Sequence, residues 1–194
     1  MQEELLKIFT ENKGYLLSKQ LTGSTMRYQL NRMLATGKVS RLRNGLYVLN
    51  DFPAYDEQQL VAGLIPEGVF CLFSAWDFYE LTTTIPREHH IALHRNTRVQ
   101  LPGFPPIRLY FWSDKYYQLG IAEVPSGDKT IRVYNPERAV CDAFRFRNKV
   151  GQEMCSEVLR NYLLRNDANI DLLLRYAHEL RIEKIITPYL HSML

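Results

Sequence analysis

The chain has little that would cross-link it or hold it in a lipid bilayer. Its three cysteines, Cys71, Cys141 and Cys155, are widely spaced and form no CxxC pair. This spacing supports neither a disulfide framework nor a zinc knuckle, so we expect reduced structural thiols. The longest apolar run, Val69 to Phe73, is far shorter than the ~18 residues of a membrane span. The first residues also lack the basic end of a signal peptide, and we expect a cytoplasmic protein.

The sequence also lacks the short motifs of common catalytic and cofactor sites. It contains no P-loop, dinucleotide fingerprint, His-Glu-x-x-His motif or nucleophile elbow. Asp77 and Glu80 lie three residues apart without the Gly-Ser loop that a nucleotidyltransferase needs before its carboxylates. On a predicted strand, His90 and His94 would stand ~13 Å apart, too far to share a metal ion. We therefore expect no metal, no cofactor and no catalytic activity.

Acidic residues are missing from most of the first quarter of the chain. Residues 1–50 carry 8 Lys and Arg against 3 Asp and Glu, whereas residues 51–194 carry 16 against 18. No acidic residue lies between Glu11 and Asp51, and the seven basic residues there are Lys13, Lys19, Arg27, Arg32, Lys38, Arg41 and Arg43. This asymmetry indicates an anionic partner for the first part of the chain.

What remains is the composition of an ordinary globular protein, with 46% apolar residues, so disorder and collagen are excluded. At roughly 100 to 200 residues per domain, the length allows one domain, or a small domain joined to a medium one. We place the boundary at Asn50 to Pro53, because Pro53 ends strand pairing and the charge balance changes sign there. The predicted domains are residues 1–50 and residues 51–194.

Three short helices are predicted at the start of the chain. The first carries the apolar face from Leu5 to Phe9 and fades at Asn12-Lys13-Gly14, and a second is expected from Leu16 to Leu21. Ser24 is the expected N-cap of the third helix. Gly37 ends that helix in the C′ position, where a left-handed conformation is accessible to glycine.

The third helix has two different faces. Met26, Leu30, Met33 and Leu34 fall at i, i+4, i+7 and i+8 and form a buried stripe. The opposite face is polar, aromatic and basic, and consists of Ser24, Thr25, Tyr28, Asn31 and Arg32. Tyr28 either stacks on a sugar or a thymine methyl group or covers the hairpin that follows, and both interpretations stay open.

Two strand-like runs, residues 39–43 and 46–49, flank Asn44-Gly45, the dipeptide most favoured in two-residue hairpin turns. Arg41 and Arg43 are two residues apart, so we expect them on the same side of their strand. Helices followed by a basic hairpin are the order of a winged helix-turn-helix, whose third helix enters the major groove while the hairpin wing reaches the neighbouring backbone or minor groove. The alternatives are a winged helix used for protein contacts, or simply a small basic domain.

The second domain is predicted to be mixed α/β with a helical tail. The predicted strands are residues 69–73, 90–94, 107–112 and 130–133. The predicted helices are one from Asp56, one capped by Ser74, one from Pro136, residues 153–165, residues 170–180 capped by Asn169, and one after Pro188.

Several side chains of the second domain are given structural roles. The Glu137 carboxylate is expected in the first turn of its helix, where it interacts favourably with the positive end of the helix dipole. Arg138 and Asp142 have the i, i+4 spacing of an ion pair. The aromatic groups are expected to pack in the core, with a ligand pocket or an interface as the alternative. Tyr116-Tyr117 is the pair expected to be exposed.

Four segments resemble the AbiEi-type antitoxins. They are Ser18 to Leu21, Leu34 to Tyr47, Ser74-Ala75 and Tyr134 to Asp142, and the resemblance covers most of the chain. The most specific patterns are G-x-x-x-R-x-R-x-G-x-Y in the wing and N-P-E-R-A-x-x-D. The resemblance implies a type IV toxin-antitoxin pair, in which the N-terminal winged helix represses its own operon and the C-terminal domain counteracts a nucleotidyltransferase-like toxin. The family's wing roles fall on Arg41, Arg43 and Asn44, and its recognition-helix roles on Thr25, Tyr28 and Arg32.

The sequence thus predicts an α/β (α+β) protein, with an N-terminal winged helix-turn-helix followed by a mixed α/β domain with a helical C-terminal tail. We expect a DNA-binding repressor and antitoxin, whose partners are double-stranded operator DNA and a nucleotidyltransferase-like toxin. The predicted DNA contacts are Lys13, Ser24, Thr25, Arg27, Tyr28, Asn31, Arg32, Lys38, Arg41, Arg43 and Asn44. Two alternatives stay open: a winged-helix regulator whose second domain senses a small molecule, and a nucleic-acid-processing enzyme that the first domain anchors.

Overall fold

A computed structural model describes residues 2–12, 14–51, 57–101, 105–127 and 129–193. The chain mixes helices and strands and divides into two compact units, unit 1 (Met1–Glu57) and unit 2 (Gln58–Leu194). The predicted boundary residues Phe52 and Pro53 lie outside the described residues. None of the helices in the described part of the chain combines the length and the apolar character that crossing a bilayer requires.

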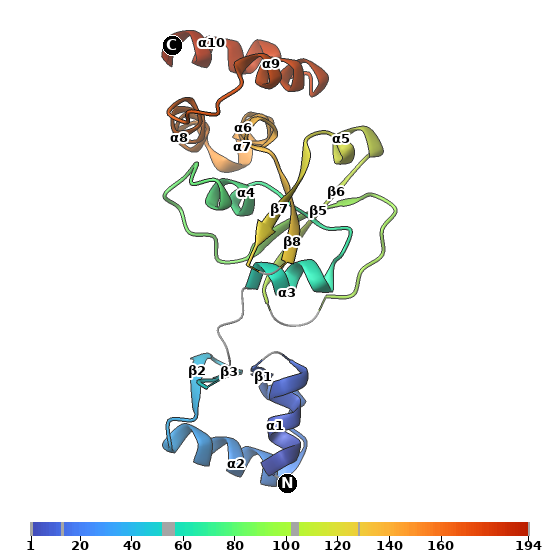
Figure 1. Cartoon of the computed structure of the whole chain (residues 1–194), viewed down its shortest axis with the longest axis vertical. Helices are drawn as coiled ribbons and strands as arrows, with labels where there is room; N and C mark the ends of the chain where they lie inside the picture. The colour runs from blue at the N-terminus through green and yellow to red at the C-terminus, as the bar shows by residue number, and fades with distance from the viewer. Residues whose placement is uncertain (1, 13, 52–56, 102–104, 128, 194) are drawn as a thin grey trace. The chain divides into compact units, whose positions relative to one another are not determined.

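Unit 1 packs helices against a small antiparallel sheet with the strand order β1-β3-β2 (Figure 1). Its elements in chain order are α1 (Gln2–Glu11), β1 (Tyr15–Leu17), the 3-10 turn η1 (Ser18–Gln20), α2 (Gly23–Ala35), β2 (Val39–Arg43) and β3 (Leu46–Leu49). The core forms where the apolar sides of α1 and α2 meet the sheet, and its buried side chains are Leu5, Phe9, Leu16, Leu30, Met33 and Val39.

The predicted helix from Leu16 to Leu21 is wrong. Leu16 lies in β1, opposite Tyr47 of β3, and is fully buried. The strand ends where the Leu17 N–H donates to Gln20 Oε1 at 2.8 Å, and only the turn η1 follows. A short apolar run suits a strand as well as a helix, and pairing with the distant β3 decides between them.

Helix α2 confirms the predicted stripe and corrects the predicted cap. Met26, Leu30 and Met33 are buried, and Leu34 is half-buried. The N-cap is Thr22, so Ser24 lies in the first turn of the helix rather than before it. Thr22 makes no side-chain cap hydrogen bond, and its hydroxyl donates to the Met26 sulfur at 3.3 Å. Gly37 ends the helix region with φ +69°, as predicted.

Unit 2 is built on a five-stranded mixed sheet with the order β6-β5-β4-β8-β7. The strand pairs β5/β6 and β4/β8 are parallel, and β4/β5 and β7/β8 are antiparallel. The strands are β4 (Val69–Phe70), β5 (His89–His94), β6 (Ile107–Trp112), β7 (Ile121–Ser126) and β8 (Lys129–Tyr134). The helices are α3 (Glu57–Leu64), α4 (Phe73–Phe78), α5 (Asp114–Gln118), α6 (Pro136–Arg145), α7 (Arg147–Val150), α8 (Gln152–Leu163), α9 (Ile170–Glu179) and α10 (Glu183–Met193).

The predicted run from Val69 to Phe73 is only partly a strand. Pairing stops after Phe70, and Leu72 turns the chain into α4 with φ 46°. Leu72 is the N-cap of α4, so the predicted cap by Ser74 is wrong. The Ser74 hydroxyl instead accepts the His90 backbone N–H at 2.8 Å, which ties the helix to β5.

At the helical end, one prediction is confirmed and one is corrected. Asn169 caps α9, with its side chain accepting the Leu172 N–H. The last helix does not begin after Pro188, because α10 starts at Glu183 and contains this proline. Proline has no backbone N–H and is common at the first position of a helix, where that donor is not needed. The sequence therefore predicted a helix start at Pro188.

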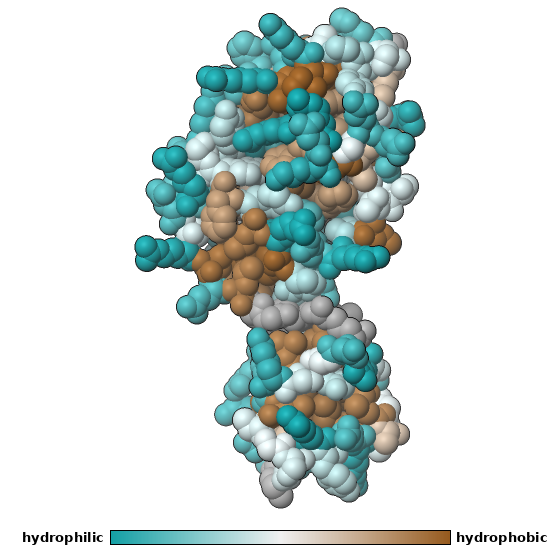
Figure 2. Space-filling view, turned by 180° about the vertical axis from the view of Figure 1, so that it is seen from behind, coloured by the Kyte–Doolittle hydropathy of each residue, from teal (hydrophilic) through white to brown (hydrophobic). Residues whose placement is uncertain are grey.

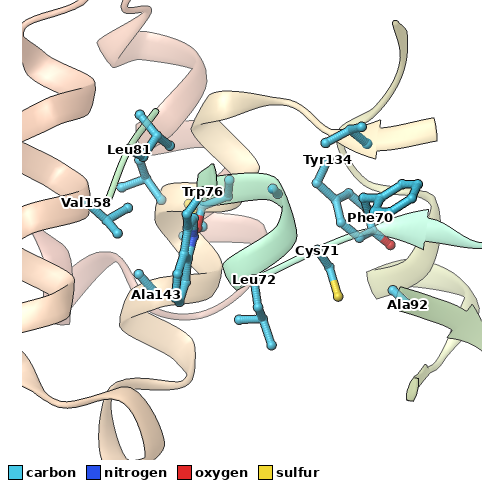
Figure 3. Packing of buried hydrophobic residues seen from close by; sticks show 14 of the residues in the cluster. Phe70, Cys71, Leu72, Trp76, Leu81, Ala92, Tyr134, Ala143 and Val158 are labelled. Carbon is cyan, nitrogen blue, oxygen red and sulfur yellow. The ribbon is translucent and has the colours of Figure 1, made fainter. Parts of the chain in front are cut away.

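The buried core of unit 2 joins the sheet to the helices (Figure 3). Trp76 of α4 is fully buried and donates from Nε1 to the Ala139 carbonyl at 2.9 Å. Figure 3 shows it between the sheet residues Phe70 and Tyr134 on one side and Val158 of α8 on the other. All three cysteines are free and buried, as expected.

A few apolar side chains of the described residues remain exposed. The large ones are Tyr28, Leu64, Ile85, Leu101, Phe111 and Leu164. Figure 2 shows one face of the molecule, on which brown apolar side chains gather in a patch on unit 2 among mostly teal hydrophilic ones. The predicted core role of the aromatic groups therefore holds for Phe70 and Trp76, but not for Phe111, which is 50% exposed.

Helix α6 buries the predicted ion pair of Arg138 and Asp142. Arg138 Nε lies 3.1 Å from Asp142 Oδ1, and both side chains are fully buried. The guanidinium also donates from Nη1 to the carbonyls of Tyr116 and Leu119, each at 2.7 Å. Gly120, with φ +79°, makes this approach possible, because a Cβ at that position would lie 2.7 Å from Arg138 Cβ.

We expect His90 to make unit 2 less stable in mild acid. His90 is 5% exposed, its Nδ1 lies 2.9 Å from the Tyr110 hydroxyl, and burial, with the charges of Arg108 and His89, lowers its pKa from 6.5 to about 4. Between pH 6.5 and 4, His90 is protonated in the unfolded chain but stays neutral in the folded chain. The free energy of unfolding is therefore highest above pH 6.5 and falls by about 2 kcal/mol toward pH 4.

Denaturant unfolding followed by tryptophan fluorescence at a series of pH values measures this effect. The variant His90→Gln should lose this part of the pH dependence, whereas the variant of the exposed His191, His191→Gln, should keep it. Identical pH profiles for the two variants would contradict the assignment to His90.

Candidate nucleic-acid interface

The solvent-facing side of α2 presents six of the predicted contact residues. Ser24, Thr25, Arg27, Tyr28, Asn31 and Arg32 are all exposed. Tyr28 is 69% exposed, so most of its side chain faces solvent. Among the described residues, no carboxylate lies within salt-bridge distance of Arg27 or Arg32, and their charge is directed to solvent.

A groove of about 430 Å³ follows this helix. Four predicted residues line it, namely Thr25, Tyr28, Arg32 and Lys38. Lys38 is exposed and reaches the groove from the turn between α2 and β2. The groove therefore combines hydroxyl, aromatic and cationic groups, a set that suits the sugar, base and phosphate parts of a nucleic acid.

Three groove residues, Gln29, Met33 and Thr36, are absent from the predicted DNA contacts, and Met33 belongs to the buried stripe of α2. Gln29 Oε1 is buried and has no hydrogen-bond partner within the described residues. The helical spacing contained the signal, because Gln29 lies four residues after Thr25 and three before Arg32. Its place between the apolar stripe and the polar face hid it.

The hairpin forms as predicted. Strands β2 and β3 pair antiparallel with Arg43 opposite Leu46, so Asn44 and Gly45 form a two-residue turn, with Gly45 at φ +78°. The Ser18 N–H donates to the Gly45 carbonyl at 2.8 Å and holds the turn against η1.

The wing arginines need a correction. The register shifts between Arg41 and Arg43, and such a bulge removes the regular alternation on which their predicted same-side placement depends. The exposed Arg41 guanidinium donates to the Asn44 side-chain oxygen, which orients both side chains at the turn. The side chain of Arg43 and the whole of Lys13 lie outside the described residues.

Other candidate chemistry does not assemble in unit 2. Within the described ranges, no three His, Cys, Asp or Glu side chains gather as metal ligands would. The prediction that Tyr116-Tyr117 is exposed is wrong, since Tyr117 is 5% exposed and its hydroxyl donates to the Glu67 carbonyl. Helix α5 buries Tyr117 and leaves Tyr116 half-buried, which its first residues, the polar Asp114 and Lys115, did not reveal.

Comparison with known protein families and curated proteins found no match. No protein-family model matches the chain, and neither does any curated protein. The features of unit 1 that bear on function are therefore the α2 face, the groove and the hairpin.

Proposed function

We propose that this protein is a DNA-binding transcriptional repressor whose unit 1 is a winged helix-turn-helix. The observation that carries the proposal is the exposed side of α2, which is basic and lies in a stretch without any acidic residue from 12 to 50. The order of helix, strand, short helical turn, helix and two-stranded hairpin supports it, with η1 in the place of the second helix. In such a domain α2 is the recognition helix.

The contacts of the proposed complex divide by chemistry. Thr25, Tyr28, Asn31 and Arg32 meet base edges in the major groove, which admits one α-helix. Lys38, Arg41, Arg43 and Lys13 neutralise phosphates and release counterions. The groove on α2 lies where these two groups meet, because Arg32 and Lys38 both line it.

We further propose that the protein is an antitoxin of the AbiEi type that represses its own operon. The wing pattern and the N-P-E-R-A-x-x-D segment support this role by resemblance. The second pattern has a structural part: Asn135 caps α6, and Arg138 pairs with Asp142 in the core. The partner of unit 2 is then a nucleotidyltransferase-like toxin, and the protein itself is not an enzyme.

Fluorescence anisotropy with the full chain tests the DNA-binding proposal. The protein's own upstream DNA should bind about 1,000-fold more tightly than a scrambled duplex, at several salt concentrations. Equal, salt-steep binding to both duplexes would leave a generic nucleic-acid anchor. Absence of binding would make unit 1 a protein-contact domain. A magnesium- or manganese-dependent product from labelled DNA or RNA would overturn the non-enzymatic assignment.

Arg32→Ala is expected to weaken binding to the specific DNA by about 1–3 kcal/mol, because a guanidinium can grip a guanine edge with two hydrogen bonds. The loss should be much smaller on the scrambled duplex. An equal loss on both duplexes would identify Arg32 as a backbone contact. The nearby Lys19→Ala is a matched control, since Lys19 is exposed on η1 and lies outside the groove.

A further inference from the structure

A polar pocket of about 610 Å³ lies in unit 2, where strand β5 ends. Residues from four separate segments line it: the residues just before β4, the end of β5 with the loop that follows it, helix α5 and strand β8. None of these residues belongs to the candidate DNA-binding face, and the inference drawn from the pocket does not rest on the proposed function.

Arg132 is held in this pocket without losing its charge. Its Nη1 donates to the Glu67 carbonyl and to the Tyr117 hydroxyl, each at 3.1 Å. Its guanidinium also lies 5.8 Å from the centre of the Tyr117 ring. All of these partners are neutral groups, so they orient the guanidinium without forming an ion pair with it, and Glu123 lies opposite Arg132 on the neighbouring strand β7.

The loop that supplies the other side of the pocket is anchored as well. The Asn96 N–H donates to His94 Nδ1 at 3.4 Å, and the Thr97 N–H donates to the His94 carbonyl at 2.9 Å. The Arg95 N–H continues the sheet by donating to Trp112 at 2.8 Å. The exposed Arg98 therefore extends from a fixed turn, and within the described residues no carboxylate forms an ion pair with Arg98 or Arg132.

We propose that this pocket binds the phosphate group of a small phosphorylated molecule. Two unpaired guanidinium groups face it, together with the neutral donors of Asn96, Thr97 and Gln118. A phosphate monoester has three terminal oxygens and a charge near −2, so it uses more donors than a carboxylate with two oxygens can. The lining includes one carboxylate, Glu67, whose side chain is exposed, so solvent screens its repulsion of an anion.

The size and the rings of the pocket favour an organic phosphate over the free ion. A volume of about 610 Å³ is in the range of small-molecule sites and far larger than one phosphate. The half-buried His94 packs edge to face on the buried Tyr117, with ring centres 6.2 Å apart, and its ring gives the rest of such a molecule a surface to contact. The phosphate would lie at the arginines and the organic part along the His94 ring.

Isothermal titration calorimetry of the full chain with ribose 5-phosphate, ribose and inorganic phosphate at equal ionic strength tests the proposal. We expect saturable binding of ribose 5-phosphate, weaker binding of inorganic phosphate and none of ribose. Arg98→Gln should weaken the binding of ribose 5-phosphate at least tenfold. The matched control Arg95→Gln removes the same charge from the neighbouring exposed residue outside the pocket and should leave binding unchanged. Arg98 is the better site for substitution, because Arg132→Gln also removes two internal hydrogen bonds.

Four results would overturn the proposal. The first is no saturation by either phosphate compound up to about 10 mM, a concentration that corresponds to negligible affinity. The second is an equal loss of binding in Arg98→Gln and Arg95→Gln, which would indicate charge alone. The third is binding of inorganic phosphate with no gain from the ribose, which would leave a simple ion site. The fourth is competition of duplex DNA with ribose 5-phosphate combined with a lower DNA affinity of Arg98→Gln, which would assign the pocket to a nucleic-acid backbone.

Discussion

Asp142→Ala is expected to destabilise unit 2 by about 3–5 kcal/mol, because it leaves the buried Arg138 charge without its counter-ion. Arg138 is fully buried, and its guanidinium lies over the rings of Trp112 and Tyr134 at 4.9 Å and 4.4 Å. These rings and two backbone carbonyls orient the cation, and within the described part of the chain only Asp142 brings a negative charge to hydrogen-bond distance of it. Burial raises the pKa of the Asp142 carboxyl, and the charge of Arg138 opposes that effect.

Denaturant unfolding followed by tryptophan fluorescence measures this loss in unit 2 alone, since both tryptophans of the chain, Trp76 and Trp112, belong to it. The control is Asp167→Ala, which breaks the ion pair between the exposed Asp167 and the half-buried Arg165 and should change the unfolding midpoint much less. The double variant Arg138→Met with Asp142→Leu should be less destabilised than Asp142→Ala, because it leaves no unpaired charge. Equal unfolding midpoints for Asp142→Ala and Asp167→Ala would show that the buried pair contributes no more to stability than the pair of Arg165 and Asp167.

The ion pair also shows where prediction from the sequence ends. The i, i+4 spacing of Arg138 and Asp142 predicted their contact, because both lie on one helix. The same spacing is typical of exposed helix faces. Their burial depends on Trp112 from β6 and Tyr134 from β8, which only the folded sheet brings together. The contact between the two side chains was therefore predictable from the sequence, whereas the burial that sets its contribution to stability was not.

Elsewhere, too, the correct predictions concern contacts between neighbours in the chain, and the wrong ones concern contacts between distant segments. The hairpin at Asn44-Gly45 and the stripe on α2 arise from neighbours in the chain, and both are confirmed. Leu16 became a strand residue through pairing with a segment some thirty residues later, which no local pattern contains. Strand β7 was missed because Glu123 and Pro125 weaken its pattern, and a proline is tolerated there since β7 is an edge strand.

The candidate site follows this rule too. The exposed face of α2 could be predicted from helical periodicity, and the structure places its residues as expected. The bulge between Arg41 and Arg43 could not, since it depends on the register with β3. The pocket around Arg132 was out of reach of the sequence, because its residues come from four separate segments.

Removing four charges from the proposed DNA-binding face is expected to have the largest effect on binding. The variant carries Gln in place of Arg27, Arg32, Lys38 and Arg41, which are all exposed, so unit 1 should remain folded. Lys38 and Arg41 are the proposed phosphate contacts among these four, and each lost phosphate contact lowers the slope of log K against log salt by about 0.9, so the slope should fall by about 2. The affinity for the upstream duplex should fall at least about 100-fold at low salt, because the released counterions supply much of the binding free energy.

The control removes the same number of charges from exposed residues of unit 2, by replacing Lys149, Arg160, Arg175 and Lys184 with Gln. Both variants lower the formal net charge of +3 by the same amount, so a general attraction between the protein and DNA is reduced equally in the two. If the face of α2 and the wing bind DNA, only the unit 1 variant should show a smaller salt dependence and a lower affinity for DNA. Circular dichroism should show that both variants are folded. Equal losses in the two variants would show that net charge, and not this face, governs binding, and the winged-helix proposal would fail.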